Sequence, residues 1–191
     1  DKIVKEYGGI YNHAGLQAYV NEIGQKLARN TERPDVTYKF TLLDSPVVNA
    51  FALPGGYIYV TRGTLAVANS EDELAGVIGH EIGHVTARHQ AARYSEGVVT
   101  QLGASILAAV VRSPAVNQAL SVGTNLYMSS YSREQESEAD RLGIRYLSRA
   151  GYNTQSIANF LANMENYQTA EAKIKGKEKH GAGYFSSHPD T

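Results

Sequence analysis

The residues best suited to chemistry lie in one short segment, His80-Glu81-Ile82-Gly83-His84. Residues four apart on a helix share a face, so His80 and His84 can both reach one metal ion with bonds of about 2.0–2.1 Å. Glu81 lies about 100° around the helix from His80, where its carboxylate can address a water molecule held by that metal. The HExxH spacing therefore predicts two zinc ligands and a general base for hydrolysis.

The surroundings of this segment favour a metal site over its simplest alternative, two exposed histidines on an ordinary amphipathic helix. Gly79 precedes the segment and Gly83 lies within it. Each glycine costs a helix about 1 kcal/mol relative to alanine. That cost is tolerable where a substrate, or a helix that carries another ligand, must approach the backbone closely.

A run of acidic residues supplies candidates for the third ligand, because the chain has no cysteine. Glu136 and Asp140 share a helix face that continues through Gly143 and points inward. Glu134 and Glu138 share a second face, which reads as solvated and ion-paired. We therefore expect Glu136 to be the third ligand and Asp140 to accept the distal N–H of a ligating histidine. Alternatively, all four acids merely favour a helix N-terminus.

The remaining histidines are assigned no role, and the tyrosines are considered only as possible hydrogen-bond donors. His89 is five residues beyond His84 and is expected to point to a different face, so it is assigned no role, and the same holds for His13 and His180. A tyrosine could donate a hydrogen bond to the oxyanion of the reaction, but the sequence does not choose among Tyr94, Tyr127 and Tyr131.

The elements that must position these residues form an α+β, mainly helical pattern. Helices are expected from Asn12 as N-cap to residue 30, from the Ser70 cap to about residue 93, from the Ser132 capping box to residue 150, and from Thr154 to about 164. Three strands are expected at 36–42, 47–52 and 57–60. Their connections look too short for parallel crossovers, which predicts a small antiparallel sheet. One domain over residues 1–191 is the simplest account.

Bulk composition excludes some classes of protein. The 191 residues carry a net charge of −1, so there is no basic excess for nucleic-acid binding. The apolar stretch 97–111 is shorter than the roughly 20 residues that a membrane-spanning helix needs. It reads as a buried core helix, with membrane contact as the alternative. The mixed, charged start shows no signal peptide, as in a mature protein that has lost its targeting segment.

Several motifs together resemble one family. His80-Glu81-x-x-His84, followed about fifty residues later by Glu136-x-x-Ala139-Asp140, resembles the HtpX and CAAX prenyl endopeptidase-like zinc metallopeptidases of the gluzincin type. Residues 49–59, residues 71–79 and Ser187-His188-Pro189 are similar to further elements of that family. The similarity spans about residues 35–191 and is closest to the soluble, periplasmic BepA-like branch.

The resemblance implies a zincin-like domain with a small sheet, an active-site helix and one Zn²⁺ per chain. Its ligands would be His80, His84 and Glu136, with Glu81 as the base and Asp140 as support. The resemblance also implies an edge strand, along which an extended peptide adds by backbone hydrogen bonds, at Asn49, Ala50, Phe51 and Ala52.

His188 has two implied roles. It is either a fourth ligand in a resting, self-inhibited state or a catalytic group that steadies the oxyanion. The family usually continues past the His-Pro element to an arginine, whereas this sequence ends at Thr191. The interpretation therefore allows for a C-terminal module beyond the visible chain.

The expected function is a metalloendopeptidase of envelope protein quality control in the bacterial periplasm or cell envelope. Its substrate would be an unfolded or misassembled protein or peptide, and it would contact the membrane surface or an outer-membrane assembly. Alternatives are a chaperone-like or scaffold module, with a structural zinc or a site locked by His188, and a non-peptidase zinc hydrolase. The intact Glu81 favours the enzyme, because a structural site needs no base.

Overall fold

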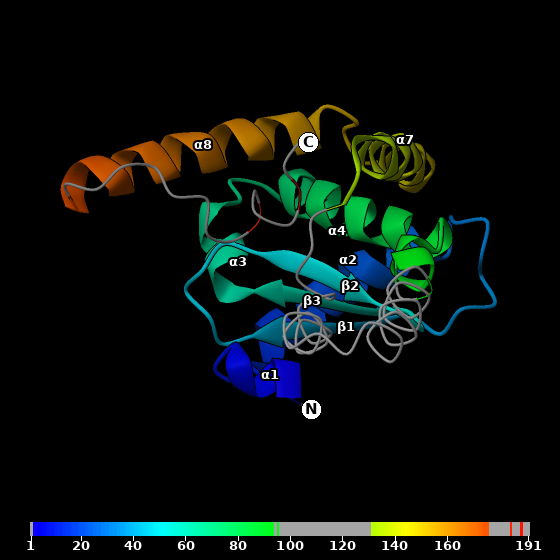
Figure 1. Cartoon of the computed structure of the whole chain (residues 1–191), viewed down its shortest axis with the longest axis horizontal. Helices are drawn as coiled ribbons and strands as arrows, with labels where there is room; N and C mark the ends of the chain where they lie inside the picture. The colour runs from blue at the N-terminus through cyan, green and yellow to red at the C-terminus, as the bar shows by residue number, and fades with distance from the viewer. Residues whose placement is uncertain (1, 94, 96–130, 176–183, 185–187, 189–191) are drawn as a thin grey trace, which may run out of the picture.

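The computed structural model describes residues 2–93, 95, 131–175, 184 and 188. The expected α+β, mainly helical class is confirmed (Figure 1). The described helices are α1 (Lys2–Glu6), α2 (Ala14–Ala28), α3 (Arg62–Val67), α4 (Glu71–Thr86), α7 (Arg133–Ala150) and α8 (Ser156–Lys175). The strands are β1 (Lys39–Leu43), β2 (Ala50–Leu53) and β3 (Tyr57–Thr61). The apolar stretch 97–111 lies outside the described residues, and none of the described helices is both long and apolar enough to cross a membrane.

The sheet is mixed, and the expectation of an all-antiparallel sheet is wrong. β2 pairs with β3 in an antiparallel hairpin, but β3 also pairs with β1 in parallel, which gives the strand order β1-β3-β2. A parallel pair needs a connection of about a dozen residues or more. Residues 44–56 provide it because β2 itself lies within the connection, as the edge strand.

Local capping explains where the helices that carry the site begin. The Ser70 hydroxyl accepts a hydrogen bond from the Glu73 amide at the start of α4, and Ser132 forms the expected capping box on α7. Three expectations at helix ends are wrong. Helix α8 runs to Lys175, well past the expected end at about residue 164. The N-cap of α2 is His13 rather than Asn12, because the His13 ring accepts from Leu16 N. Helix α4 ends at Thr86, well before residue 93.

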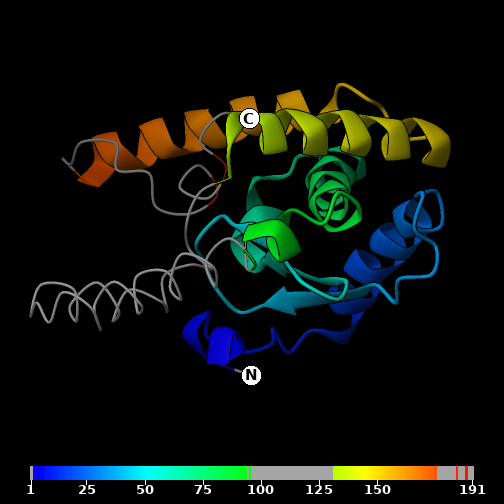
Figure 2. The ribbon, with the colours of Figure 1, turned by 45° about the vertical axis from the view of Figure 1, so that its right-hand side comes forward.

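Helix α4 is the centre of the molecule. It lies between the sheet and α2 on one side and α7 and α8 on the other (Figures 1 and 2). Its residues from Leu74 to Val85 are all buried. Because α4 is covered on both sides, the histidines on it are shielded from water by elements from both ends of the chain.

Helices α4 and α7 approach each other so closely that glycines are needed at the contact. A Cβ on Gly83 would lie 2.6 Å from the Ala139 carbonyl oxygen, and one on Gly143 would lie 3.0 Å from His80 N. Both distances are against backbone atoms, which cannot move aside as a side chain can. The expected close approach of a helix is confirmed at Gly83, whereas a Cβ on Gly79 would lie in ordinary contact, 3.5 Å from the Gly143 carbonyl oxygen.

Glu32 fixes α7 at its C-terminal half. Its carboxylate accepts hydrogen bonds from Tyr146 Oη at 2.7 Å and from Arg145 and Arg149 at 3.0 and 2.9 Å. Burial opposes ionisation, but these hydrogen bonds outweigh it and lower the pKa of Glu32 to about 2. The turn after α2 therefore helps to set the position of α7 on α4.

Two glycines of α4 give a matched pair of variants. We expect Gly83→Ala to lower the free energy of unfolding by about 1–3 kcal/mol, because its Cβ overpacks the contact with α7. Gly79→Ala should be neutral or stabilising by up to about 1 kcal/mol, since the nearest atom to its Cβ is 3.5 Å away and alanine favours the helix. Urea unfolding of both variants measures the difference. Equal stability of the two would contradict the close packing.

Candidate metal centre

The structure brings together His80, His84, Glu136 and His188, called here the ligand cluster. One ligand atom of each residue lies within 4.8 Å of those of the other three. His80 and His84 project from one face of α4, and Glu136 comes from the first turn of α7. All four side chains are at most 1% exposed. Three separate parts of the chain thus meet at one buried point.

The distances within the ligand cluster suit a tetrahedral metal ion. His80 Nε2 lies 3.0 Å from His84 Nε2, 3.2 Å from His188 Nδ1 and 3.3 Å from Glu136 Oε2. Glu136 Oε1 lies 3.7 Å from His84 Nε2 and 3.1 Å from His188 Nδ1. Tetrahedral bonds of about 2.0–2.1 Å place ligand atoms about 3.3–3.4 Å apart. Imidazole nitrogens and a carboxylate are ligands that zinc takes, so the donor set fits such an ion.

Each ligand of α4 is oriented by a residue behind it. His80 Nδ1 lies 2.8 Å from Asp140 Oδ1, which is the contact expected for Asp140. His84 Nδ1 lies 2.9 Å from His89 Nδ1, and His89 Nε2 lies 3.2 Å from Glu138 Oε2. With Nε2 of His84 free to bind a metal, its Nδ1–H donates to His89, whose Nε2–H donates to Glu138. Both imidazoles are thereby held in the ligating tautomer.

His89 is the residue that the sequence analysis missed. A continuous helix to residue 93 would carry it away from His84, but α4 ends at Thr86 and the chain turns back. Arg88 adopts a left-handed conformation with φ of 60°, and residues 89–93 form a new helical turn. Neither glycine nor proline marks this break, so the sequence offered no signal for it. Glu138 lies on the solvated, ion-paired face expected for it, with its side chain 52% exposed, and its partner is His89.

The buried charges set the protonation of the ligand cluster. Burial lowers the pKa of His84 well below its ordinary value, and the charge of His80 adds to this effect. Burial also opposes the charge on His80, but hydrogen bonds to Asp140 and Glu136 outweigh it and raise its pKa to about 10. The pKa of Glu136 falls to about 2, because hydrogen bonds with His188 and His80 outweigh its burial. The anionic carboxylate therefore requires positive charge beside it, which a metal cation would also supply.

Glu81 faces His188 across the site. Its side chain is 0% exposed, and its Oε1 lies 3.2 Å from His188 Nε2. The contact with His188 is an ion pair, and by geometry neither carboxylate oxygen of Glu81 has a hydrogen-bond partner among the described residues. Burial lowers the pKa of His188, but the charge of Glu81 and the hydrogen bond with Glu136 outweigh it, so that pKa is raised. Glu81 thus lies inside the buried site beside the ligand cluster, within reach of a group bound there.

Two tyrosine rings enclose the ligand cluster. Tyr131 stacks on His84 with 3.8 Å between ring centroids, and Tyr184 stacks on His188 at 4.4 Å. Burial raises the pKa of both phenols, so both remain neutral donors. Of the three tyrosines considered as oxyanion donors, the structure places Tyr131 at the site, and the other two, Tyr94 and Tyr127, lie outside the described residues.

Strand β2 is the edge of the sheet, and its outward-facing groups are fewer than the sequence suggested. Asn49 precedes the strand, and its carbonyl accepts a hydrogen bond from Thr61 N, so its backbone faces β3. Antiparallel pairing alternates, so Phe51 also faces β3, whereas Ala50 and Ala52 direct their N–H and C=O groups away from it. An extended peptide could therefore pair with Ala50 and Ala52 but not with Asn49.

Comparison with known proteins adds to this geometry. The sequence model of peptidase family M48 matches residues 14–191. The beta-barrel assembly-enhancing protease of Escherichia coli strain K12 is 33% identical over 164 residues, which cover 81% of this chain and 34% of that protein. The mitochondrial metalloendopeptidase OMA1 of Schizosaccharomyces pombe is 27% identical over 195 residues, which cover 100% of this chain and 55% of that protein. The chain thus spans about a third of the length of its bacterial relative.

Removal of His89 tests the orienting chain behind His84. We expect His89→Ala to weaken zinc binding about 10–100-fold, because His84 loses the acceptor that fixes its tautomer. Glu138→Gln should weaken it less, and Glu134→Gln, an exposed neighbour on the same helix, should not change it. Competition with a metal chelator measures all three affinities. An unchanged affinity in His89→Ala would show that the contact with His84 has no effect on the metal.

Proposed function

Since the chain belongs to peptidase family M48, we propose that it is a zinc-dependent metalloendopeptidase. The observation that carries this proposal is the buried Glu81 carboxylate beside His80, His84 and Glu136. A structural metal site needs no base, and burying a carboxylate there is unfavourable unless the carboxylate has a function. The same observation argues against a scaffold with a structural zinc.

In this proposal His80, His84 and Glu136 hold one zinc ion per chain. Zinc, when bound, lowers the pKa of water toward 7 and acts as a Lewis acid on a carbonyl oxygen. Glu81 accepts the proton of the attacking water and returns it to the leaving amine. Asp140 keeps the ring of His80 in place through the 2.8 Å contact with its Nδ1.

The proposed substrate is an extended stretch of an unfolded or misassembled protein. The support for it is the edge position of β2, where Ala50 and Ala52 present backbone groups to a partner strand. Backbone pairing of this kind recognises an extended peptide whatever its side chains are. This feature favours a peptidase over a zinc hydrolase of small molecules.

We further propose that the chain is a single metallopeptidase domain that acts in the bacterial periplasm or cell envelope, in contact with the assembly of outer-membrane proteins. The support is the name of its Escherichia coli relative, which describes that protein as one that enhances β-barrel assembly. By its name, the OMA1 relative is a mitochondrial protein, so proteins similar to this chain also occur in a different compartment. Fractionation of cells that express the chain tests the location.

A second candidate function is a module whose site is closed at rest. His188 Nδ1 stands close to His80 and Glu136 in the ligand cluster, where a catalytic zinc would keep an open position. Tyr184 N also donates a hydrogen bond to Val48 O at 3.0 Å, directly before the edge strand. The chain's own residues thus lie at the metal site and beside the edge strand, an arrangement that suits a chaperone-like or scaffold role as long as it persists.

Glu81→Gln separates the base from the ligands. We expect this variant to keep its zinc and to lose at least about 10³-fold in casein cleavage, because it can no longer take a proton from water. Glu136→Ala should lose both zinc and activity. Metal analysis and a cleavage assay are run on the same samples. Cleavage by Glu81→Gln at the parental rate would remove Glu81 from the mechanism.

His188→Ala tests the closed state. We expect cleavage to rise severalfold, because the fourth position at the metal opens to water and substrate. The same casein assay measures the rate, and metal analysis shows whether zinc is retained. A fall in rate with zinc retained would instead assign His188 to the oxyanion.

A further inference from the structure

A pocket of about 250 Å³ lies at the C-terminal end of α4. It is lined by the turn after β2, including Gly55 and Gly56, and by the segment that follows α4. Three of its nine lining residues are strong hydrogen-bond donors, namely Arg33, Arg88 and Gln90, and none of the nine is acidic. Valine, alanine and proline complete its walls. The pocket is therefore small and positively charged.

Gln90 supplies a second, independent observation. Its side chain is only 8% exposed and forms a hydrogen bond with Tyr131, but its Nε2 has no hydrogen-bond partner by geometry among the described residues. Buried amide donors are nearly always paired in folded proteins, because an unpaired one has lost its water without replacement. A ligand with an acceptor oxygen in the pocket would satisfy it.

The two arginines define the charge of that ligand. Arg88 is exposed. Within the described part of the chain, Arg33 forms one ion pair, with Asp35 at 3.5 Å, and the Asp35 side chain is 72% exposed. A guanidinium presents a planar fork of N–H groups that matches a carboxylate. Two guanidiniums and a buried amide donor around one small space fit a single carboxylate better than any neutral group.

The position of the pocket connects it with the peptide path. Its Pro54, Gly55 and Gly56 directly follow β2, so a peptide paired along that edge would run past it. Gln90 follows His89, which contacts His84, and its side chain forms a hydrogen bond with Tyr131, which stacks on His84. Gln90 therefore connects the pocket with the ligand cluster through Tyr131.

We propose that this pocket is a specificity subsite that binds a carboxylate of the peptide substrate. The inference rests on the proposed peptidase function and names a preference of the same site. The carboxylate is either an Asp or Glu side chain or the C-terminus of the peptide. The left-handed backbone conformation of Arg88 agrees with this role. It breaks the helix after α4, and this break places the side chains of Arg88 and Gln90 at the pocket.

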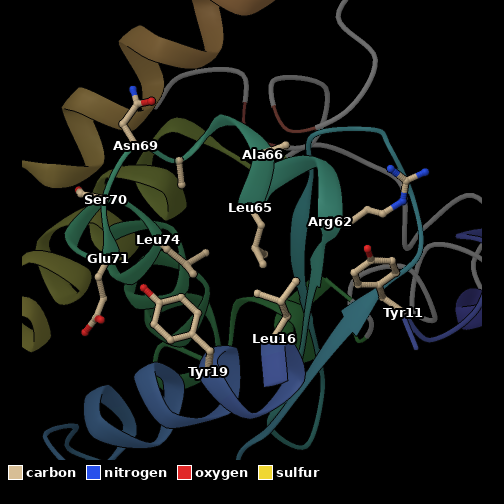
Figure 3. Close-up of a pocket in the computed structure, with 11 residues that line it drawn as sticks. Tyr11, Leu16, Tyr19, Arg62, Leu65, Ala66, Asn69, Ser70, Glu71 and Leu74 are labelled. Carbon is tan, nitrogen blue, oxygen red and sulfur yellow. The ribbon is translucent and has the colours of Figure 1, made fainter. Parts of the chain in front are cut away.

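A larger pocket supplies the control. It measures about 560 Å³ and lies between α2, α3 and the start of α4 (Figure 3), with Arg62 as its one arginine. Arg62 is held by Asp44 in an exposed ion pair at 2.6 Å. None of the residues of the ligand cluster lines this pocket. Loss of the Arg62 charge should therefore leave peptide selection unchanged.

The test compares pairs of peptides that differ only by Glu against Gln at one position. We expect the parent to cleave the Glu peptide with a kcat/KM about tenfold higher at one fixed distance from the cut bond. Arg88→Asn, which tolerates the left-handed backbone but lacks the charge, and Arg33→Gln should each bring this ratio close to one. Arg62→Gln should keep the parental ratio. The preference should also weaken as salt rises.

The source of the carboxylate is decided by a second arm. A Glu/Gln ratio well above one assigns an acidic side chain. A second pair, with a free against an amidated C-terminus, assigns the chain end if amidation lowers kcat/KM about tenfold. Either result supports the subsite. Ratios near one in the parent for both kinds of pair, or a ratio unchanged in Arg88→Asn and Arg33→Gln, overturn it.

Binding separates this inference from the proposed function. In a Glu81→Gln/His188→Ala background, neither cleavage nor His188 interferes, and fluorescence anisotropy reports peptide affinity directly. Tighter binding of the carboxylate peptide that depends on Arg88 supports the subsite even if no variant cleaves any peptide. Equal affinity for both peptides, together with normal casein cleavage by the parent, overturns the subsite and leaves the peptidase intact.

Discussion

The close contact between the backbones of α4 and α7 determines the rest of the site. At Gly83 the helix approaches the Ala139 carbonyl so closely that a Cβ would lie 2.6 Å from it. Only at this separation can Glu136 on one helix come within 3.3 Å of His80 on the other. The contact buries a carboxylate at 1% exposure, which is unfavourable unless positive charge accompanies it. Folding and cation binding are therefore linked, because each stabilises the arrangement that the other requires.

Helix α7 supplies more than the carboxylate of the ligand cluster. Asp140, one turn after Glu136, accepts from the distal nitrogen of His80. Glu138 reaches His84 through His89, although it lies on another side of the same helix. Both histidines of α4 are thus oriented from α7. A small shift of this helix would disturb the ligand and both supports at once, which explains why Glu32 fixes its far end with three hydrogen bonds.

Features with local causes could be predicted from the sequence, and features with nonlocal causes could not. Caps at Ser70 and Ser132 follow from a side chain that bonds an amide three residues on, so the sequence shows them directly. The approach of Glu136 to His80 and His84 was also expected, because each has a recognisable helical spacing. The parallel pairing of β1 with β3 depends on how a hairpin docks, which no local pattern records. The role of His89 was missed because Arg88 adopts φ of 60° although it is not glycine. The sequence therefore did not indicate the chain reversal that brings His89 into contact with His84.

The closed arrangement depends on the same charges that catalysis would use. His188 lies 3.2 Å from Glu81 Oε1 and 3.1 Å from Glu136 Oε1, so one imidazolium balances two buried carboxylates. Tyr184, four residues earlier, holds the Val48 carbonyl next to the edge strand. Departure of His188 would remove the partner of Glu81 and leave Glu136 with His80 alone, which is unfavourable in a buried site unless a cation or a proton takes its place. A cation held by His80, His84 and Glu136 would supply such charge at Glu136, whereas a bond between that cation and His188 would hold the closed arrangement in place.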